Sequence, residues 1–104
     1  MNIIVESLGT FANPSQKQQL SLSKGEMLSF DYDDEKITVT IESVESEFYN
    51  ISLSHGFCLE VCGKINLNDA RTTFILPKDF ETVLALPLYD ASYKLKFSSV
   101  KEND

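Results

Sequence analysis

Apolar and polar residues alternate along most of the chain between residues 19 and 99. Alternation with a period of two is typical of a strand with one buried face, and no stretch of ten or more residues shows the period of about 3.6 residues of an amphipathic helix. Turn-forming pairs such as Lys24-Gly25, His55-Gly56 and Asn68-Asp69 interrupt the alternation at short intervals. The pattern predicts an antiparallel all-β protein.

The clearest pattern lies in residues 27–41, where two alternating segments flank the polar run at residues 33–36. A hairpin loop formed by this run would join three apolar cross-strand pairs on one face. We therefore expect a buried face made by Tyr32 with Ile37, Phe30 with Val39, and Leu28 with Ile41.

Seven further segments have the length and patterning of strands. They lie at about residues 2–6, 19–23, 48–54, 57–67, 72–76, 82–88 and 93–99. Residues 1–104 are expected to form a single domain. Eight or nine short strands at this spacing favour a two-sheet β-sandwich, with a small β-barrel as the alternative.

The segment at residues 57–67 is the longest of these predicted strands. Its alternation predicts that Phe57, Leu59 and Val61 face the core, and that Gly63 bends or bulges the strand. Residues 12–19 are the most polar early segment and are predicted to form a loop.

The charge balance narrows the possible partners. Sixteen acidic residues against nine basic ones give a net charge of −7 in 104 residues, and the isoelectric point is about 4.6. This balance argues against nucleic acid and anionic lipid and favours a cationic partner. The chain begins without the basic region of a signal peptide, and no segment is long and apolar enough to span a membrane. We therefore expect a cytoplasmic protein that does not bind membranes.

No motif in the sequence predicts catalysis, a metal or a cofactor. The single histidine, His55, has no nucleophile motif around it and is predicted to lie in a surface turn. With Cys58 and Cys62 it gives the spacing H-x-x-C-x-x-x-C, which lacks the paired ligands of a zinc site. Along one strand the Cα atoms of the two cysteines would lie roughly 13 Å apart, too far for a disulfide. Two free and mostly buried thiols are expected.

Acidic residues concentrate between Asp31 and Glu47. This segment holds seven acids and a single base, Lys36, so it carries −6 of the net −7. In the predicted hairpin, the loop acids cap one end and Glu45 and Glu47 lie in the turn at the other end. A field of one sign steers a basic partner toward the surface that carries it.

An aromatic residue adds to this acidic segment. If Ile51 and Leu53 face the core, Phe48 points outward beside Glu45 and Glu47, and an exposed aromatic ringed by charge is typical of an interface hot spot. A bulge at Glu47-Phe48 would instead bury it. The predicted partner-binding residues are Asp31, Asp33, Asp34, Glu35, Glu42, Glu45, Glu47 and Phe48.

Two other interpretations of the acidic segment remain open. Charged residues also keep proteins soluble and protect sheet edges from pairing with other chains. Clustered carboxylates at residues 31–35 could also ligate Ca²⁺, although the run does not match the spaced calcium loop of an EF-hand.

In size, acidity and expected compartment, the chain resembles the small acidic immunity proteins that bacteria make against their own nuclease toxins, including those of contact-dependent growth inhibition systems. This resemblance implies a non-enzymatic inhibitor whose carboxylates take the place of substrate phosphates opposite the lysine and arginine residues of a toxin. The alternative is a lectin-like, carbohydrate-binding β-sandwich with Phe48 and Tyr89 as aromatic contacts, in which residues 31–35 could hold a calcium ion. A structural subunit would need an exposed sheet edge or apolar patch, which the sequence does not locate.

Overall fold

The computed structural model describes residues 1–8, 15–32, 34–87 and 93–100, and among these residues it contains nine strands and no helix. All strand pairings are antiparallel, so the predicted all-β fold is confirmed. The strands are β1 (Asn2–Leu8), β2 (Gln16–Ser21), β3 (Met27–Tyr32), β4 (Glu35–Val44), β5 (Phe48–Val61), β6 (Lys64–Ile65), β7 (Arg71–Pro77), β8 (Thr82–Ala85) and β9 (Lys94–Val100).

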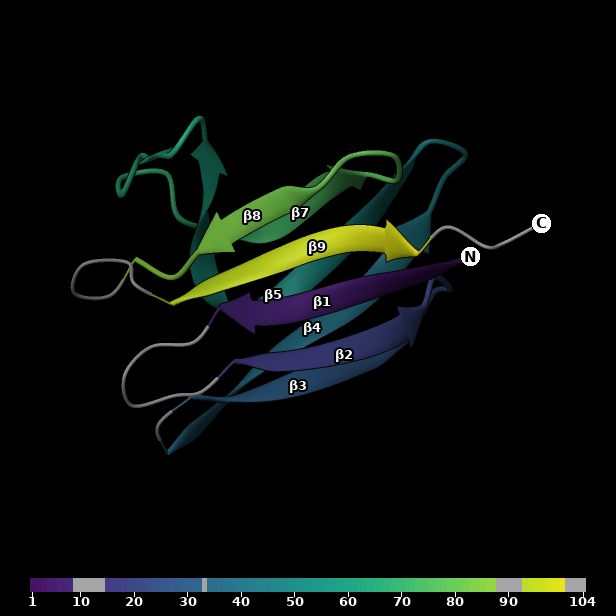
Figure 1. The fold of residues 1–104 in the computed structure, drawn as a ribbon, viewed down its shortest axis with the longest axis horizontal. Coiled ribbons are helices and arrows are strands. Elements are labelled where there is room, and N and C mark those ends of the chain that lie inside the picture. Colours follow the sequence, from purple (N-terminus) through teal and green to yellow (C-terminus); the bar gives the residue numbers. More distant parts are fainter. Residues whose placement is uncertain (9–14, 33, 88–92, 101–104) are drawn as a thin grey trace.

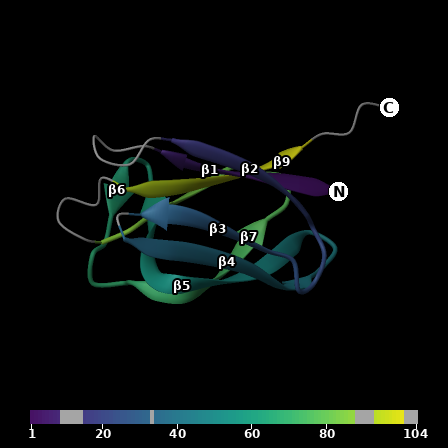
Figure 2. The same ribbon diagram turned by 90° about the horizontal axis from the view of Figure 1, so that it is seen from below.

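The strands form two facing layers of one sheet (Figures 1 and 2). The first layer has the order β2-β1-β9-β8 and ends on the second half of β5. The second layer contains β3, β4, the first half of β5, and β7. Buried side chains from both layers form a single hydrophobic cluster between them.

The strand β5 belongs to both layers. Its residues 48–53 pair with β4 and β7, whereas residues 58 and 59 pair with β8. Between Ser52 and Phe57 the register against β7 shifts, and four residues of β5 lie opposite one residue of β7. The extra residues allow the strand to bend from one layer into the other. The predicted turn at His55-Gly56 is therefore wrong, because these residues lie within one bent strand.

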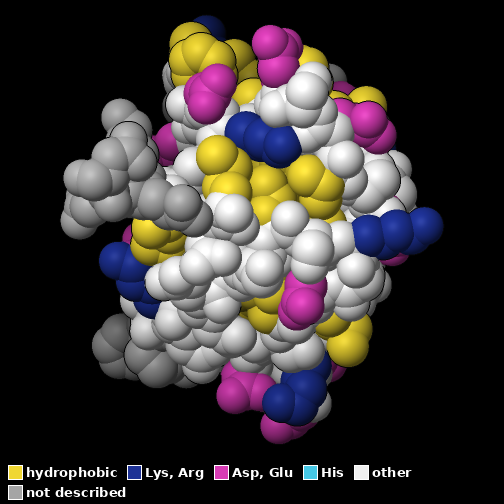
Figure 3. Space-filling model, turned by 90° about the vertical axis from the view of Figure 1, so that its right-hand side faces the viewer, with side chains coloured by type: hydrophobic (Ala, Val, Ile, Leu, Met, Phe, Trp, Pro, Cys, Tyr) yellow, Lys and Arg dark blue, Asp and Glu magenta, His cyan; other side chains and the backbone are white. Residues whose placement is uncertain are grey.

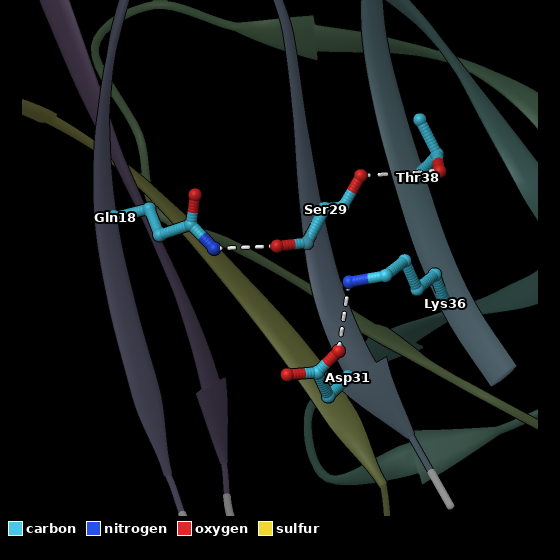
Figure 4. Close-up of polar contacts among 5 residues, drawn as sticks. All are labelled: Gln18, Ser29, Asp31, Lys36 and Thr38. Atoms are coloured by element: carbon cyan, nitrogen blue, oxygen red, sulfur yellow. Dashed lines mark hydrogen bonds and ion pairs between the residues drawn. The ribbon is translucent and has the colours of Figure 1, made fainter. Parts of the chain in front are cut away.

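At the opposite edge of the layers, β2 and β3 lie side by side and nearly close the sheet into a barrel. One side-chain hydrogen bond crosses this gap, from Gln18 Nε2 to the carbonyl oxygen of Ser29 at 2.5 Å (Figure 4). The sheet is therefore nearly closed, as in the predicted barrel alternative, and its two layers face each other as in a sandwich.

The strand β2 starts earlier than predicted, because residues 16–19 pair with β1 although their side chains are polar. A strand at the end of a layer needs few apolar residues, and in β2 only Leu20 is buried. The predicted loop at residues 12–19 is therefore wrong for residues 16–19. The loop prediction for residues 12–14 lies outside the described residues.

The hairpin of β3 and β4 is shifted from its predicted register by two residues. Tyr32 pairs with Glu35, Phe30 with Ile37, and Leu28 with Val39. The shorter turn places Asp31 opposite Lys36, and their side chains form an ion pair on the outer face. Because side chains alternate with a period of two, this shift leaves the same residues inside. Leu28, Phe30, Ile37, Val39 and Ile41 are all buried, as predicted, whereas Tyr32 is only partly buried against the core.

Beyond its pairing with β8, β5 forms a short hairpin with β6. Cys62 and Gly63 make the turn, and both have positive φ angles, 53° and 75°. Two positive φ angles are typical of a type I′ turn, so Gly63 belongs to a hairpin turn rather than to a bulge. This hairpin extends beyond the core, which leaves Leu59 38% exposed and Val61 57% exposed. The prediction that Leu59 and Val61 are buried is wrong, whereas Phe57 is fully buried.

Candidate functional site

The acidic residues at the tip of the β3–β4 hairpin lie beside side chains that can bind their carboxylates. Lys36 Nζ donates a hydrogen bond to Asp31 Oδ1 at 3.0 Å (Figure 4). Glu35 Oε2 lies 3.3 Å from His55 Nε2. Asp34 is exposed, and Asp33 lies outside the described residues. We call Asp31, Asp34 and Glu35 the tip acids.

His55 is better oriented than the sequence predicted. Its Nδ1 lies 2.8 Å from the hydroxyl oxygen of Ser54, and that hydroxyl accepts the backbone N–H of Thr38 at 2.9 Å. With Glu35 on the other ring nitrogen, this arrangement fits an imidazole that carries its proton on Nε2. These contacts join Ser54 and His55, at the bend of β5, to Thr38 and Glu35 of β4. We therefore assign this chain of contacts to holding the bend of β5 against β4.

The acids at the other end of β4 are less compensated. Glu42, Glu45 and Glu47 are all exposed, and within the described residues none of them forms an ion pair. Glu42 occupies the irregular position between β4 and β5, where its Oε1 accepts the hydroxyl of Ser52 at 2.6 Å. We call Glu42, Glu45 and Glu47 the turn acids.

Exposed apolar side chains lie beside the turn acids. Phe48, the first residue of β5, is 44% exposed, which confirms its predicted outward position. It pairs with Pro77 of β7, and two residues further along Asn50 pairs with Ile75, which is 70% exposed. Side chains two residues apart on neighbouring strands share one face. Phe48, Ile75 and Pro77 thus form a small apolar surface next to the turn acids.

A hollow borders this apolar surface. Its volume is about 690 Å³, and its lining includes Glu42, Asn50 and Ile75 of the second layer and Thr82 of β8 in the first layer. Ile75 was not among the predicted partner-binding residues, although its position between the inward residues Phe74 and Leu76 was the available signal. The sequence pattern does not predict the strand pairing that brings β7 next to Phe48.

The tip acids and the turn acids lie at opposite ends of the second layer. The strand β4 separates them, and a strand of its length spans about 30 Å, compared with a longest molecular extent of 41 Å. Between the two groups the outer face carries uncharged polar side chains. These are Ser29, Thr38, Thr40, Asn50, Ser52 and Thr73.

The outer face of the first layer has a different character, because its charges are mixed. Lys94 Nζ lies 2.5 Å from Glu60 Oε1, and Lys96 Nζ lies 3.4 Å from Glu81 Oε2. Lys17 and Glu6 occupy paired positions on β2 and β1. Acids without a basic neighbour therefore gather on the second layer and its turns.

A second hollow lies at the end of the molecule where β1 begins and β9 ends. Its volume is about 700 Å³, and Met1, Phe80 and Val100 supply its apolar lining. Figure 3 views this end of the molecule and shows hydrophobic side chains exposed near its middle, surrounded by polar surface. Phe80 is 73% exposed, so it contributes little to the core.

Within the described ranges, no group of three or more His, Cys, Asp or Glu side chains is placed to hold a metal ion. Both cysteines are free. Cys58 is buried, which raises the pKa of its thiol, whereas Cys62 is exposed in the β5–β6 turn, contrary to the prediction of two mostly buried thiols.

Comparisons of the chain with protein-family models, curated proteins and solved structures found no significant match. In the part of the chain that the structure describes, no helix has the length and hydropathy that a membrane span requires.

Proposed function

We propose that this protein is a non-enzymatic binding protein that holds a basic protein partner on the turn acids and the apolar surface beside them. The observation that carries the proposal is the position of Phe48 and Ile75, both well exposed, next to three carboxylates that form no ion pair in the described residues. Apolar anchors surrounded by charge are typical of the energetic centre of an interface.

The charge distribution supports a partner with basic residues. Unpaired carboxylates attract lysine and arginine side chains during the encounter, and such steering raises association rates by about 10- to 1000-fold at low salt. The tip acids carry the same sign but have Lys36 and His55 beside them. We therefore expect the tip acids to contribute to steering and the turn acids to contact the partner directly.

A nuclease toxin is the class of basic partner that we propose. A nuclease binds the phosphates of its substrate through lysine and arginine side chains, and a protein that presents carboxylates to those side chains blocks the substrate. The proposed role is thus that of an immunity protein, which acts by occlusion and needs no chemistry of its own.

The test is a capture experiment with the immobilised protein and a lysate of its source cells. Wild type should retain a basic protein at low salt and release it at high salt, because salt screens exposed charges. The triple variant Glu42→Gln, Glu45→Gln, Glu47→Gln should retain much less of it. Equal retention by the two baits would contradict the proposal.

The immunity role has a separate test. The captured protein, once purified, should cleave DNA or RNA, and an equimolar amount of wild type should inhibit that cleavage. A captured basic protein without nuclease activity would leave the binding function standing and contradict the immunity role.

A carbohydrate-binding function is the second candidate, and the uncharged polar face of the second layer favours it. Hydroxyl and amide groups such as those of Thr40, Asn50 and Ser52 are suited to hydrogen bonding with sugars, and Phe48 is an exposed aromatic next to them. Tyr89 lies outside the described residues. Binding of wild type to immobilised glycans, lost in Asn50→Ala and kept in the triple variant of the turn acids, would favour this function over the first.

A further inference from the structure

Among the described strands, β7 leaves one edge without a partner strand. It pairs with β5 on one side and with no strand on the other. The strand β6 is also an edge, but it has only two residues. The strands β2 and β3 lie against each other, and the side chain of Gln18 binds the backbone of Ser29 across the gap. The edge of β7 is therefore the one at which another strand could be added.

The register shows which backbone groups of β7 face away from β5. The backbone N–H of Lys78 donates to the carbonyl of Glu47, and the pairs that follow are Leu76 with Tyr49 and Phe74 with Ile51. In an antiparallel ladder, alternate residues direct both N–H and C=O to the same neighbour. Phe74 and Leu76 therefore bond to β5, and the backbone groups of the alternate residues, Thr73 and Ile75, point to the free edge.

The free edge has little protection against strand addition. Natural edges are commonly blocked by lysines, bulges or prolines. The sequence of β7 is Arg-Thr-Thr-Phe-Ile-Leu-Pro, so its proline removes one outward N–H at the end of the strand, whereas Thr73 and Ile75 keep theirs. The hollow of about 690 Å³ follows this strand and is lined by Thr73, Ile75 and Pro77. A docked strand would find main-chain partners at two residues and space for alternate side chains.

The charged side chains around the free edge of β7 determine which kind of strand it could bind. The turn acids lie near the end of β7, and Asp79 and Glu81 follow it in sequence, with Lys78 before them and Lys96 Nζ 3.4 Å from Glu81 Oε2. Arg71, at the start of β7, has Asp69 3.8 Å away. An extended segment with lysine or arginine side chains fits these surroundings, whereas a second copy of this chain brings another charge of −7.

We propose that the free edge of β7 binds an extended basic segment of the partner as an added strand, through main-chain hydrogen bonds to Thr73 and Ile75. This inference rests on the proposed function and specifies how the partner is held. The turn acids then select a basic segment, and the backbone of β7 fixes its conformation and register.

Hydrogen exchange measured by NMR tests the inference without any mutation. The probe is a blocked peptide of about eight residues in which lysine and valine alternate, long enough to cover an ordinary strand. The amides of Thr73 and Ile75 should exchange quickly in the free protein and slow markedly when the peptide is added. The amides of Phe74 and Leu76 should be protected in both states. Peptide binding that leaves the exchange of Thr73 and Ile75 unchanged would contradict strand addition.

A matched pair of variants tests the same inference by affinity. Thr73→Pro removes the outward backbone N–H of residue 73, a loss that an edge strand tolerates. Thr73→Val keeps this backbone N–H and has a side chain similar in shape to that of threonine. We expect Thr73→Pro to bind the peptide about tenfold more weakly than Thr73→Val, since main-chain contacts are lost. Circular dichroism establishes that each variant folds. If Thr73→Pro does not fold, Ile75→Pro and Ile75→Val form the second pair.

The outcomes separate this inference from the proposed function. Equal peptide affinity of Thr73→Pro and Thr73→Val, or no binding of the peptide to wild type at low salt, would contradict strand addition. Neither result would contradict the proposed binding of a partner by the turn acids. Equal affinity of wild type and the triple variant of the turn acids would contradict the role of those acids. A peptide with glutamate in place of lysine should not bind, and its binding would overturn the preference for a basic segment.

Discussion

The aromatic ring of Phe30 has no exposed surface and belongs to the hydrophobic cluster between the two layers. Removal of a core aromatic costs its transfer free energy and leaves a cavity, so Phe30→Ala should lower the free energy of unfolding by about 3 to 5 kcal/mol. Phe80→Ala is the matched control, because Phe80 is 73% exposed and its removal should cost far less. Urea unfolding of both variants is the measurement, and equal losses would contradict the assignment of the core.

Buried tyrosines predict how stability depends on alkaline pH. Burial raises the pKa of Tyr49 and is the main cause of the raised pKa of Tyr93. Above about pH 10 an unfolded tyrosine loses its proton while a buried one keeps it, so the folded state binds more protons and the free energy of unfolding falls as pH rises.

Tyr49→Phe should make that fall shallower. Between the unfolded and folded pKa values, each tyrosine contributes a loss of about 1.4 kcal/mol per pH unit. Urea unfolding of wild type and Tyr49→Phe between about pH 8 and about pH 11 measures the two slopes. Parallel slopes would show that Tyr49 ionises as readily in the folded protein as in the unfolded chain.

At the scale of elements, alternation alone predicted which side chains of β3 and β4 are buried, but not their register. A shift of two residues keeps Phe30 and Ile37 inside, so the pattern cannot distinguish the longer loop from the shorter turn. The continuity of β5 through His55 and Gly56 was also beyond the sequence, because it depends on pairing with β7 and β8. The turn-forming residues His55 and Gly56 do mark a change in chain direction, but the change is a bend within β5 rather than a turn between two strands.

The β5–β6 turn gives a prediction for one element. Cys62 has a φ of 53°, a conformation that costs a β-carbon-bearing residue some strain and that asparagine adopts more readily. Cys62→Asn creates the Asn-Gly pair preferred in type I′ turns and should raise the free energy of unfolding by about 0.5 to 1 kcal/mol. Cys62→Ala is the control, since it removes the thiol without favouring the turn. A gain no larger than that of Cys62→Ala would contradict the assigned turn.

At the scale of the whole molecule, the sequence located the acidic segment but not its surroundings. Alternation and turn residues were enough to expect that Glu42, Glu45 and Glu47 are exposed. The neighbours that distinguish these residues from the tip acids come from distant parts of the chain. Ile75 and Pro77 reach Phe48 through the pairing of β5 with β7, and His55 reaches Glu35 through the bend of β5. Contacts of this kind depend on strand order, which local patterning does not contain.

We propose that the turn acids hold the partner, whereas the tip acids only add to the electrostatic field that attracts it. Two triple variants with the same change in charge compare them. One is Glu42→Gln, Glu45→Gln, Glu47→Gln, and the other is Asp31→Asn, Asp34→Asn, Glu35→Gln. Both sets are exposed, so both variants should keep nearly the stability of wild type, because exposed charges contribute only about 0 to 1 kcal/mol.

The decisive measurement is the rate of association and dissociation of the captured partner with wild type and both variants, in salt from about 50 mM to about 500 mM. The turn variant should associate about tenfold more slowly at low salt and also dissociate faster, whereas the tip variant should show only a smaller loss in association. These differences in association should shrink as salt rises. Equal effects of the two variants, or dissociation that accelerates only in the tip variant, would contradict the account.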